Sequence, residues 1–297
     1  MQSVRTVEEG VQYGYLPKAQ QLDRRAYISR AKIALMLEAP EYFFALYGEG
    51  KKRPTTKAME LGRRLHYATL ENTEFRRNRQ IYRMDNLNTI EGRKWHERVQ
   101  REYPGAPIMS MAEALTMDRI VDRVMSHKLA GELIRGARTE HHGYARCPRT
   151  GLLLYSRPDI LTTEGAVGEL KFVKSVDEFA FNRQQYSDRW FMQLAFYNYV
   201  DGLITGTRKP DNCFYIAVET EYPHRLIVPT LHPTYEVMGD ILWNEGLDKI
   251  RECMERDPQM RNFEVWRAHS NKARSIEPEY FMMNNDPRFQ GLIGIGA

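Results

Sequence analysis

The sequence predicts an α/β protein with a mixed central sheet flanked by helices, and three observations support this fold class. Two apolar runs of strand length, 152–155 and 167–173, are separated by residues of turn composition. Stretches with helical spacing precede and follow these runs. The 297 residues contain no Pro-, Ser- or Gly-rich linker, and this length permits a full core. We therefore expect one domain over residues 28–283, with an extension at 1–27 and a loosely ordered tail at 284–297.

Residues 55–66 predict the first helix that contributes to a site. One side of this helix carries residues at helical spacing: Met59, Gly62, Leu65, His66 and Thr69. We expect that side to face the core, which places His66 inward. A histidine on an apolar helix face is more often a hydrogen-bonded core residue than a metal ligand, so the helix alone leaves both roles open.

The apolar runs 152–155 and 167–173 are expected to form a β-hairpin, with its turn at 162–165. Asp159 then lies across from Glu169. Alternate side chains of a strand share a face, so Glu169 and Lys171 should project together while Leu170 points into a core. The backbone carbonyl of Leu170 stays available as a ligand.

Two carboxylates and one amine in this arrangement suit the metal-dependent hydrolysis of a phosphodiester. Asp159 and Glu169 offer the oxygen ligands that Mg²⁺ prefers, and Mn²⁺ is expected to substitute for it. Such an ion lowers the pKa of a bound water and neutralises charge on the phosphoryl oxygens. Lys171 could orient or deprotonate that water and stabilise the transition state. A solvated strand face with an ordinary ion pair is the competing explanation, and this motif alone does not separate the two.

A long helix is expected after the hairpin. Residues 175–178 have the pattern of a capping box, and the helical stretch runs to about Val200. One face of this stretch, expected to pack on the sheet, carries Tyr186, Trp190, Gln193 and Tyr197. A buried glutamine needs a polar partner, so Gln193 becomes a candidate site residue. Residues 214–218 predict the strand that follows.

Four segments in this order resemble the exonuclease VIII (RecE-type) branch of the PD-(D/E)xK nucleases, over residues 28–222. They are Ile28 and Ser29 with Pro40 and Phe43, similar to an N-terminal helix of that family; residues 56–59 leading to Gly62 and His66; Arg157, Pro158 and Asp159 with Glu169 and Lys171; and residues 189–197. This chain has Trp190 where that family usually has tyrosine. It also has Glu169 where the family commonly has aspartate, a difference that changes the reach of the carboxylate rather than its chemistry.

The resemblance implies a restriction-endonuclease-like core with N-terminal helical additions, and it assigns roles within the site. It implies that His66 is an additional metal ligand beside Asp159 and Glu169, that Lys171 is the catalytic lysine, and that Gln193 supports the site or the scissile phosphate. Three further residues are expected near the site: Glu140, which aligns with a family glutamate, Arg157 and Tyr197.

The same resemblance implies Mg²⁺-dependent digestion of double-stranded DNA from its ends, 5′ to 3′, leaving 3′ single strands. It also implies a ring-shaped homo-oligomer, such as a tetramer, and a single-strand annealing protein as its partner in phage-type recombination. Two alternatives stay open. One is an endonuclease or flap-trimming enzyme of the same superfamily, and the other is a DNA-binding protein that does not cut.

Composition limits the other classes. The three cysteines, Cys147, Cys213 and Cys253, form no CxxC pair, which argues against a zinc site, a disulfide framework or a four-cysteine iron–sulfur nuclease. No apolar run has membrane-spanning length and the N-terminus lacks a signal segment, so we expect a cytoplasmic protein without a membrane partner.

The net charge of +4 is too small to identify a nucleic-acid binder by itself. Basic residues nevertheless gather near the His66 helix and after Lys171: Lys51, Lys52, Arg53, Arg63, Arg64, Arg76, Arg77, Arg79, Lys174, Arg183 and Arg189. They could line a groove for a phosphate backbone. Ordinary solvated charge explains any single one of them equally well.

Overall fold

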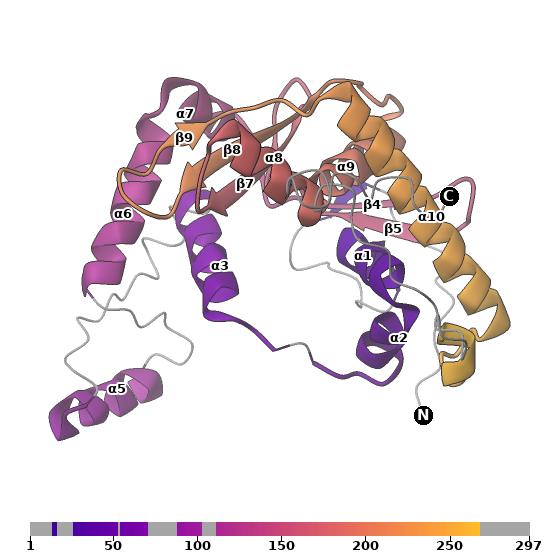
Figure 1. The fold of residues 1–297 in the computed structure, drawn as a ribbon, viewed down its shortest axis with the longest axis horizontal. Helices are drawn as coiled ribbons and strands as arrows, with labels where there is room; N and C mark the ends of the chain where they lie inside the picture. The colour runs from indigo at the N-terminus through magenta and orange to yellow at the C-terminus, as the bar shows by residue number, and fades with distance from the viewer. Residues whose placement is uncertain (1–13, 17–25, 53, 71–87, 103–110, 268–297) are drawn as a thin grey trace, which may run out of the picture.

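The computed structural model describes residues 14–16, 26–52, 54–70, 88–102 and 111–267 (Figure 1). Most of the expected extension and all of the expected tail lie outside the described residues. The strands are β1 Gly14–Leu16, β2 Ile28–Ser29, β3 Arg138–Thr139, β4 His142–Arg146, β5 Leu153–Ser156, β6 Ile160–Leu161, β7 Val167–Val173, β8 Cys213–Glu219 and β9 Leu226–Ile227. The α-helices are α1 Arg30–Glu38, α2 Pro40–Phe43, α3 Lys57–Leu70, α5 Ile90–Glu102, α6 Met111–Ser126, α7 Lys128–Arg135, α8 Glu178–Ser187, α9 Trp190–Thr205 and α10 Pro233–Arg256. Two short helices of other types are η2 Phe44–Gly48 and η3 Phe263–Trp266.

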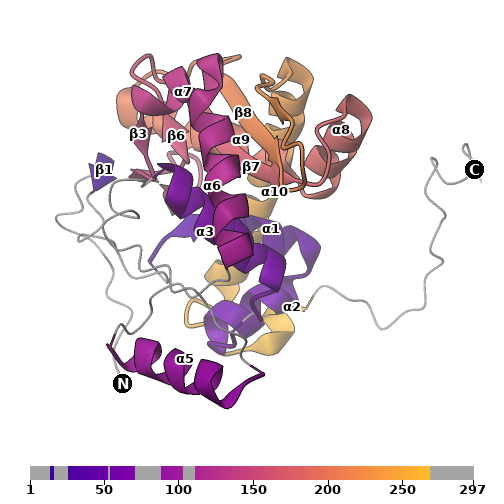
Figure 2. The same cartoon turned by 90° about the vertical axis from the view of Figure 1, so that its left-hand side faces the viewer.

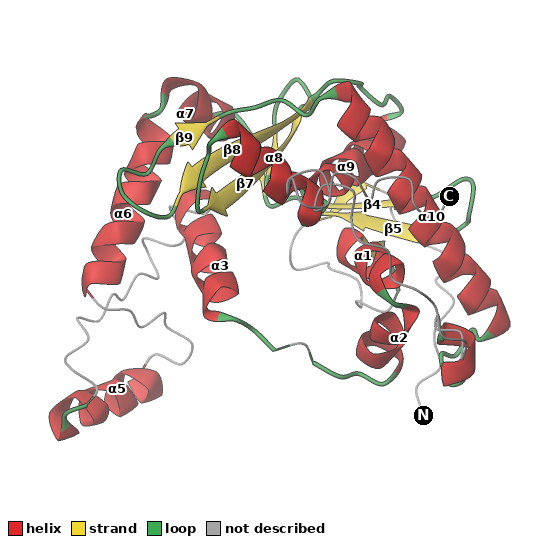
Figure 3. Cartoon of the chain, viewed as in Figure 1, coloured by secondary structure: helices red, strands yellow, loops and turns green. Residues whose placement is uncertain are grey.

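The strands form two sheets, of which the larger is mixed, as the sequence predicts (Figure 3). Its order is β3-β6-β7-β8-β9, with β6 antiparallel and β8 parallel to β7. The predicted strand at 214–218 is confirmed as β8. The smaller sheet has the order β1-β4-β5-β2. Among the described helices, none combines the length and apolar character that crossing a membrane requires.

Helices cover both faces of the β7–β8 pair, α3 and α6 on one side and α9 with α10 on the other (Figures 1 and 2). Leu170 and Ile216 are buried in the cluster that includes residues of α3 and α6, whereas Tyr215 and Ala217 are buried in the cluster that includes α9. Glu169 is paired with Tyr215 in the register of β7 and β8, so it faces α9. The sheet therefore separates the Glu169 face from the Leu170 face.

The predicted hairpin of 152–155 with 167–173 is wrong in one strand. β5 pairs with β4 and β2 of the smaller sheet, and the antiparallel partner of β7 is the two-residue strand β6. Pro158 lies between β5 and β6, and a proline has no N–H to continue a ladder, so the chain changes sheets there. The pairing of Ile160 with Gly168 still places Asp159 across from Glu169, as expected.

Two helix predictions also need correction. Ile28 and Ser29 are in a strand parallel to β5, and the helix begins at Arg30. The helix expected to run to Val200 is broken into α8 and α9, because Arg189 has a φ of 52°. Tyr186 is therefore in α8 and 59% exposed, not on the face of Gln193.

The capping box does not form either. Asp177 is the N-cap of α8 and makes no capping bond with its side chain; the Ser175 hydroxyl donates to the Asp177 carboxylate instead. On the upstream helix, Leu65 and Thr69 are buried as predicted, but Met59 is 49% exposed. It lies in the first turn of α3, before the helix reaches the sheet.

Helix α10 approaches α9 closely through a glycine. A Cβ at Gly239 would lie 2.7 Å from the Cβ of Ala195 and 3.0 Å from the backbone oxygen of Phe191. This contact fixes the distance between α9 and α10, and α9 carries Gln193. The position of that side chain thus depends on helix packing outside the site.

We expect Gly239→Ala to destabilise the protein by about 1–3 kcal/mol, because overpacking outweighs the roughly 1 kcal/mol gained in helix propensity. The control is Gly62→Ala in α3, where a Cβ would meet nothing within 4 Å. Thermal denaturation of both variants provides the measurement. Equal changes in Tm would contradict the close-packing explanation.

Candidate active site

The candidate site lies at the edge of β7 just beyond its pairing with β6. The ladder ends at Gly168, and the backbone of Leu170 finds side-chain partners instead of a strand. The Leu170 N–H donates to Asp159 Oδ2 at 2.8 Å, and the Leu170 carbonyl lies 2.8 Å from His66 Nε2. The expected backbone ligand is thus at the centre of the site.

His66 reaches this edge from α3, as its predicted inward position requires. Its Nδ1 lies 2.8 Å from the Gly62 carbonyl, and its Nε2 lies 3.1 Å from Asp159 Oδ2 as well as 2.8 Å from the Leu170 carbonyl. Both ring nitrogens therefore face acceptors, which suits the doubly protonated imidazolium. The ring also contacts Phe172 edge to face.

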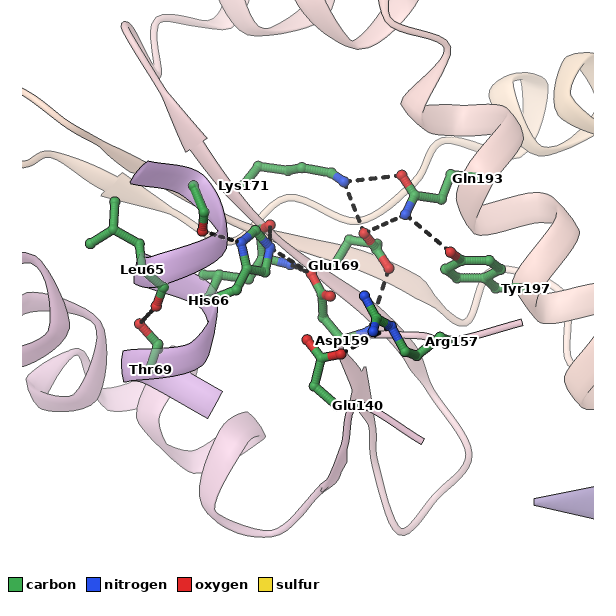
Figure 4. Close-up of polar contacts among 12 residues, drawn as sticks. Leu65, His66, Thr69, Glu140, Arg157, Asp159, Glu169, Lys171, Gln193 and Tyr197 are labelled. Atoms are coloured by element: carbon green, nitrogen blue, oxygen red, sulfur yellow. Dashed lines mark hydrogen bonds and ion pairs between the residues drawn. The ribbon is translucent and has the colours of Figure 1, made fainter. Parts of the chain in front are cut away.

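A closed triangle of hydrogen bonds joins Glu169, Lys171 and Gln193 on the face of β7 that is directed toward α9 (Figure 4). Lys171 Nζ donates to Glu169 Oε2 at 2.8 Å and to Gln193 Oε1 at 3.1 Å. Gln193 Nε2 donates to the same Glu169 oxygen at 2.7 Å, and the Tyr197 hydroxyl is 3.4 Å from that nitrogen. The polar partner predicted for Gln193 is therefore the Lys171–Glu169 pair.

Charges at the site move the pKa values of its acids and its base in different directions. Burial opposes the charge on His66, but the Asp159 carboxylate outweighs it and raises the pKa of His66 to about 9. Burial would raise the pKa of Asp159 too, but the His66 charge holds it below its usual value. Burial, followed by the charge of Asp159, raises the pKa of Glu169 to about 7. The Asp159 carboxylate is therefore ionised at neutral pH, whereas the Glu169 carboxyl gains or loses its proton near neutral pH.

Glu140 and Arg157 lie beside Asp159, as expected. The Glu140 N–H donates to the Asp159 carbonyl at 3.2 Å. The Glu140 carboxylate lies 3.0 Å from Arg157 Nε, so it is directed toward the guanidinium. The Arg157 side chain is 51% exposed, which leaves it open to an incoming anion.

The donor atoms at the edge of β7 fit a hard divalent cation. Within the described residues, no three His, Cys, Asp or Glu side chains surround one metal position. The atoms that converge are instead two side-chain donors, from His66 and Asp159, with the Leu170 carbonyl. The carboxylate and carbonyl oxygens suit Mg²⁺ or Mn²⁺, whereas the imidazole is a donor more usual for later transition metals. Glu169 Oε1 accepts a 3.4 Å hydrogen bond from the Asp159 N–H, and its other oxygen faces Lys171.

Only some of the basic residues predicted to line a groove are among the residues that the structure describes. Arg53, Arg76, Arg77 and Arg79 lie outside the described residues. Lys51 and Arg64 form ion pairs with Glu49 and Glu60, while Lys174 and Arg183 are exposed.

One residue near the site was missed by the sequence analysis. Arg30 lies close enough for its charge to interact with Tyr197 and Glu169, and burial lowers its pKa. The available signal is its position: a cation at the first residue of a helix is unfavourable beside the helix dipole, so it needs another partner.

The raised pKa of His66 predicts how the stability of the metal-free protein depends on pH. The folded protein holds this proton more tightly than the unfolded chain, so the stabilisation is complete below pH 6.5 and is lost as pH rises toward 9. We expect the free energy of unfolding in EDTA to fall over this range, by at most about 1.4 kcal/mol per pH unit. Urea denaturation at several pH values measures it, with His66→Gln as the control. A slope shared by the variant would contradict the assignment.

Comparison with known proteins places this geometry in a family. A family model described as a PDDEXK-like domain of unknown function (DUF3799) matches residues 29–278. A crystal structure of a Eubacterium rectale protein, provisionally described as an exonuclease, is similar with a TM-score of 0.57 at 12% identity, over 94% of this chain and 99% of that chain. At that identity the likeness concerns the fold alone. A search of curated proteins found no match. Because the family match spans most of the sequence, this chain belongs to the PDDEXK-like family DUF3799, within the PD-(D/E)xK superfamily.

Proposed function

We propose that this protein is a metal-dependent deoxyribonuclease that digests double-stranded DNA from its ends. The observation that carries the proposal is the open edge of β7, where His66, Asp159 and the Leu170 carbonyl converge beside the Glu169–Lys171 pair. PD-(D/E)xK nucleases generally use a divalent metal, typically Mg²⁺, and the donors here suit that ion.

The proposed mechanism assigns a task to each side chain. His66, Asp159, the Leu170 carbonyl and Glu169 would hold Mg²⁺. The bound ion would neutralise charge on the phosphoryl group and acidify the attacking water. His66 must give up its Nε2 proton to become a ligand. The lowered pKa of Asp159 favours its ionised form, so its charge is available to the ion.

Lys171 is the proposed catalytic lysine. Its amine is held on the Glu169 face by two hydrogen bonds, and its side chain is 13% exposed; we propose that a phosphate bound over the edge of β7 meets this amine. There it would orient the attacking water and stabilise the extra negative charge of the transition state. Gln193 fixes the distance between the amine and the Glu169 carboxylate, because it bonds to both.

The exonuclease mode is proposed on the resemblance to the exonuclease VIII branch. That resemblance also supports 5′ to 3′ polarity, a ring-shaped homo-oligomer around the DNA and a single-strand annealing partner. The likeness to the Eubacterium rectale protein is consistent with an exonuclease, since that protein carries this description. Endonuclease and flap-trimming modes use the same catalytic residues, so substrate topology is the test that separates them.

Lys171→Ala and Asp159→Ala should each lower cleavage of duplex DNA by at least about 100-fold, because the first removes the amine that would stabilise the transition state and the second removes a ligand of the ion. DNA binding should change little. The control is Lys249→Ala, which removes a lysine from an exposed lysine–glutamate pair of 2.6 Å on α10. Gel assays with Mg²⁺ and with EDTA measure cleavage, and fluorescence anisotropy measures binding. Near-wild-type cleavage by either site variant would refute the mechanism.

Linear and closed circular duplexes, each labelled and incubated with the wild-type protein, distinguish the modes of attack. We expect metal-dependent loss of the linear DNA only, with label from the 5′ end released first. Cutting of the circle would identify an endonuclease instead. Binding without cutting of either substrate would favour the DNA-binding alternative.

A further inference from the structure

Arg30 joins the N-terminal part of the chain to the break between α8 and α9. It is the first residue of α1 and directly follows β2, in which Ser29 pairs with Tyr155 of β5. Its Nη2 donates to the Asp188 carbonyl at 2.6 Å and to the Arg189 carbonyl at 3.0 Å. One guanidinium therefore binds two successive carbonyls that are more than 150 positions away in the sequence.

The positive charge of Arg30 interacts unfavourably with the dipole of its own helix, α1, and favourably with the dipole of α8. A cation at a helix N-terminus is unfavourable, and the first turn of α1 contains no acidic residue to offset it. At the C-terminus of α8, where the Asp188 carbonyl lies, the same cation is favourable and satisfies a carbonyl that the helix leaves free. The contacts with α8 and α9 thus explain why a cation is favourable at position 30, whereas the position in α1 does not.

The backbone bonds at the break end α8 but do not reach α9: the Asp188 N–H donates to the Gln184 carbonyl at 2.9 Å and the Arg189 N–H to the Tyr186 carbonyl at 3.1 Å. Arg189 has a left-handed φ of 52° and occupies the N-cap of α9 without a capping bond from its own side chain. The next residue, Trp190, begins α9, and its ring centre lies 5.5 Å from Lys171 Nζ. Gln193, one turn later, contacts both Lys171 and Glu169. A shift of the break would therefore move two neighbours of the Lys171 amine.

Arg30 is half-buried, and its guanidinium does not have a complete set of hydrogen bonds. Its Nε is buried and has no hydrogen-bond partner among the described residues. Leaving such a donor unsatisfied costs stability. The hydrogen bonds of this guanidinium run from Nη2 to the Asp188 and Arg189 carbonyls.

We propose that Arg30 is a positioning residue of the active site. By binding the Asp188 and Arg189 carbonyls it fixes the N-terminus of α9, and so holds Gln193 and Trp190 against the Lys171–Glu169 pair. This inference rests on the proposed nuclease function for its kinetic test and on the structure alone for its spectroscopic test.

The kinetic test compares Arg30→Ala and Arg30→Lys with wild type on linear duplex DNA. We expect Arg30→Ala to lower kcat by about 10- to 100-fold with KM changed less than about twofold, because small displacements of catalytic groups affect the transition state more than binding. Arg30→Lys should recover only part of the loss, since both bonds come from Nη2 and the shorter lysine side chain does not bring its ammonium to that position without movement of α1. The control is Arg146→Ala, which removes a 2.6 Å bond from an arginine to the Gly151 carbonyl at the distant β4–β5 turn, and it should keep wild-type kcat.

A double-mutant cycle with Gln193→Ala tests whether Arg30 affects catalysis through the helix that carries Gln193. If Arg30 acts through α9, replacing it should cost much less once Gln193 is already absent. Additive losses would overturn the inference. A raised KM at unchanged kcat would also overturn it, because it would show that Arg30 contacts DNA directly. If Arg30→Ala does not fold at the assay temperature, Arg30→Lys decides: reduced kcat at unchanged KM supports the inference, and wild-type kcat overturns it.

The fluorescence of Trp190 provides a readout that does not need activity. It is obtained for each protein as the difference from the same protein carrying Trp190→Phe. We expect the emission of Trp190 to shift in Arg30→Ala and to stay unchanged in Arg146→Ala. An unchanged emission in Arg30→Ala would overturn the positioning role even if the wild-type protein proved not to cleave DNA, an outcome that by itself would reject only the nuclease proposal.

Discussion

The unpaired edge of β7 at Leu170 is the constraint on which the site depends. A buried backbone N–H and carbonyl must find partners, and here β6 begins only at Ile160, opposite Gly168, so it does not extend far enough to supply them. Asp159 accepts from the N–H and His66 lies against the carbonyl, so two ionisable side chains take the place of a strand. The same two side chains then face each other across 3.1 Å. A gap in the sheet thus brings together the groups that can hold a cation.

Burying the charged groups at this edge costs free energy, and pairing them with opposite charges reduces this cost without removing it. The two buried carboxylates, Asp159 and Glu169, each have a cationic neighbour, His66 or Lys171, and their pKa values move in opposite directions. Buried ion pairs seldom improve stability over apolar packing of the same volume. Strongly shifted pKa values on a concentrated set of groups are instead characteristic of functional sites. The electrostatics therefore support the same conclusion as the donor chemistry.

Sequence reasoning succeeded where the determining interactions are local. The common face of Glu169 and Lys171 and the burial of Leu170 follow from strand periodicity, and the inward position of His66 follows from helical spacing. It failed where distant residues decide. The α8–α9 break is bound by Arg30, from a segment more than 150 positions away, and no local pattern around Arg189 announces it. The assignment of β5 to another sheet was signalled by Pro158, which interrupts the ladder, but the partner strands could not be inferred from it.

The length of the Glu169 side chain explains how the two halves of the site are connected. One carboxylate oxygen reaches across to the Asp159 N–H, while the other meets Lys171 and Gln193. An aspartate at this position has one methylene fewer, and from the same backbone it could not reach both sets of partners without movement of α9 or β6. Glutamate therefore suits an α9 held at this distance from β7 by its packing on α10 and by the contact of Arg30 with the α8–α9 break. The glutamate at position 169 is thus matched to the position of the helix that carries Gln193.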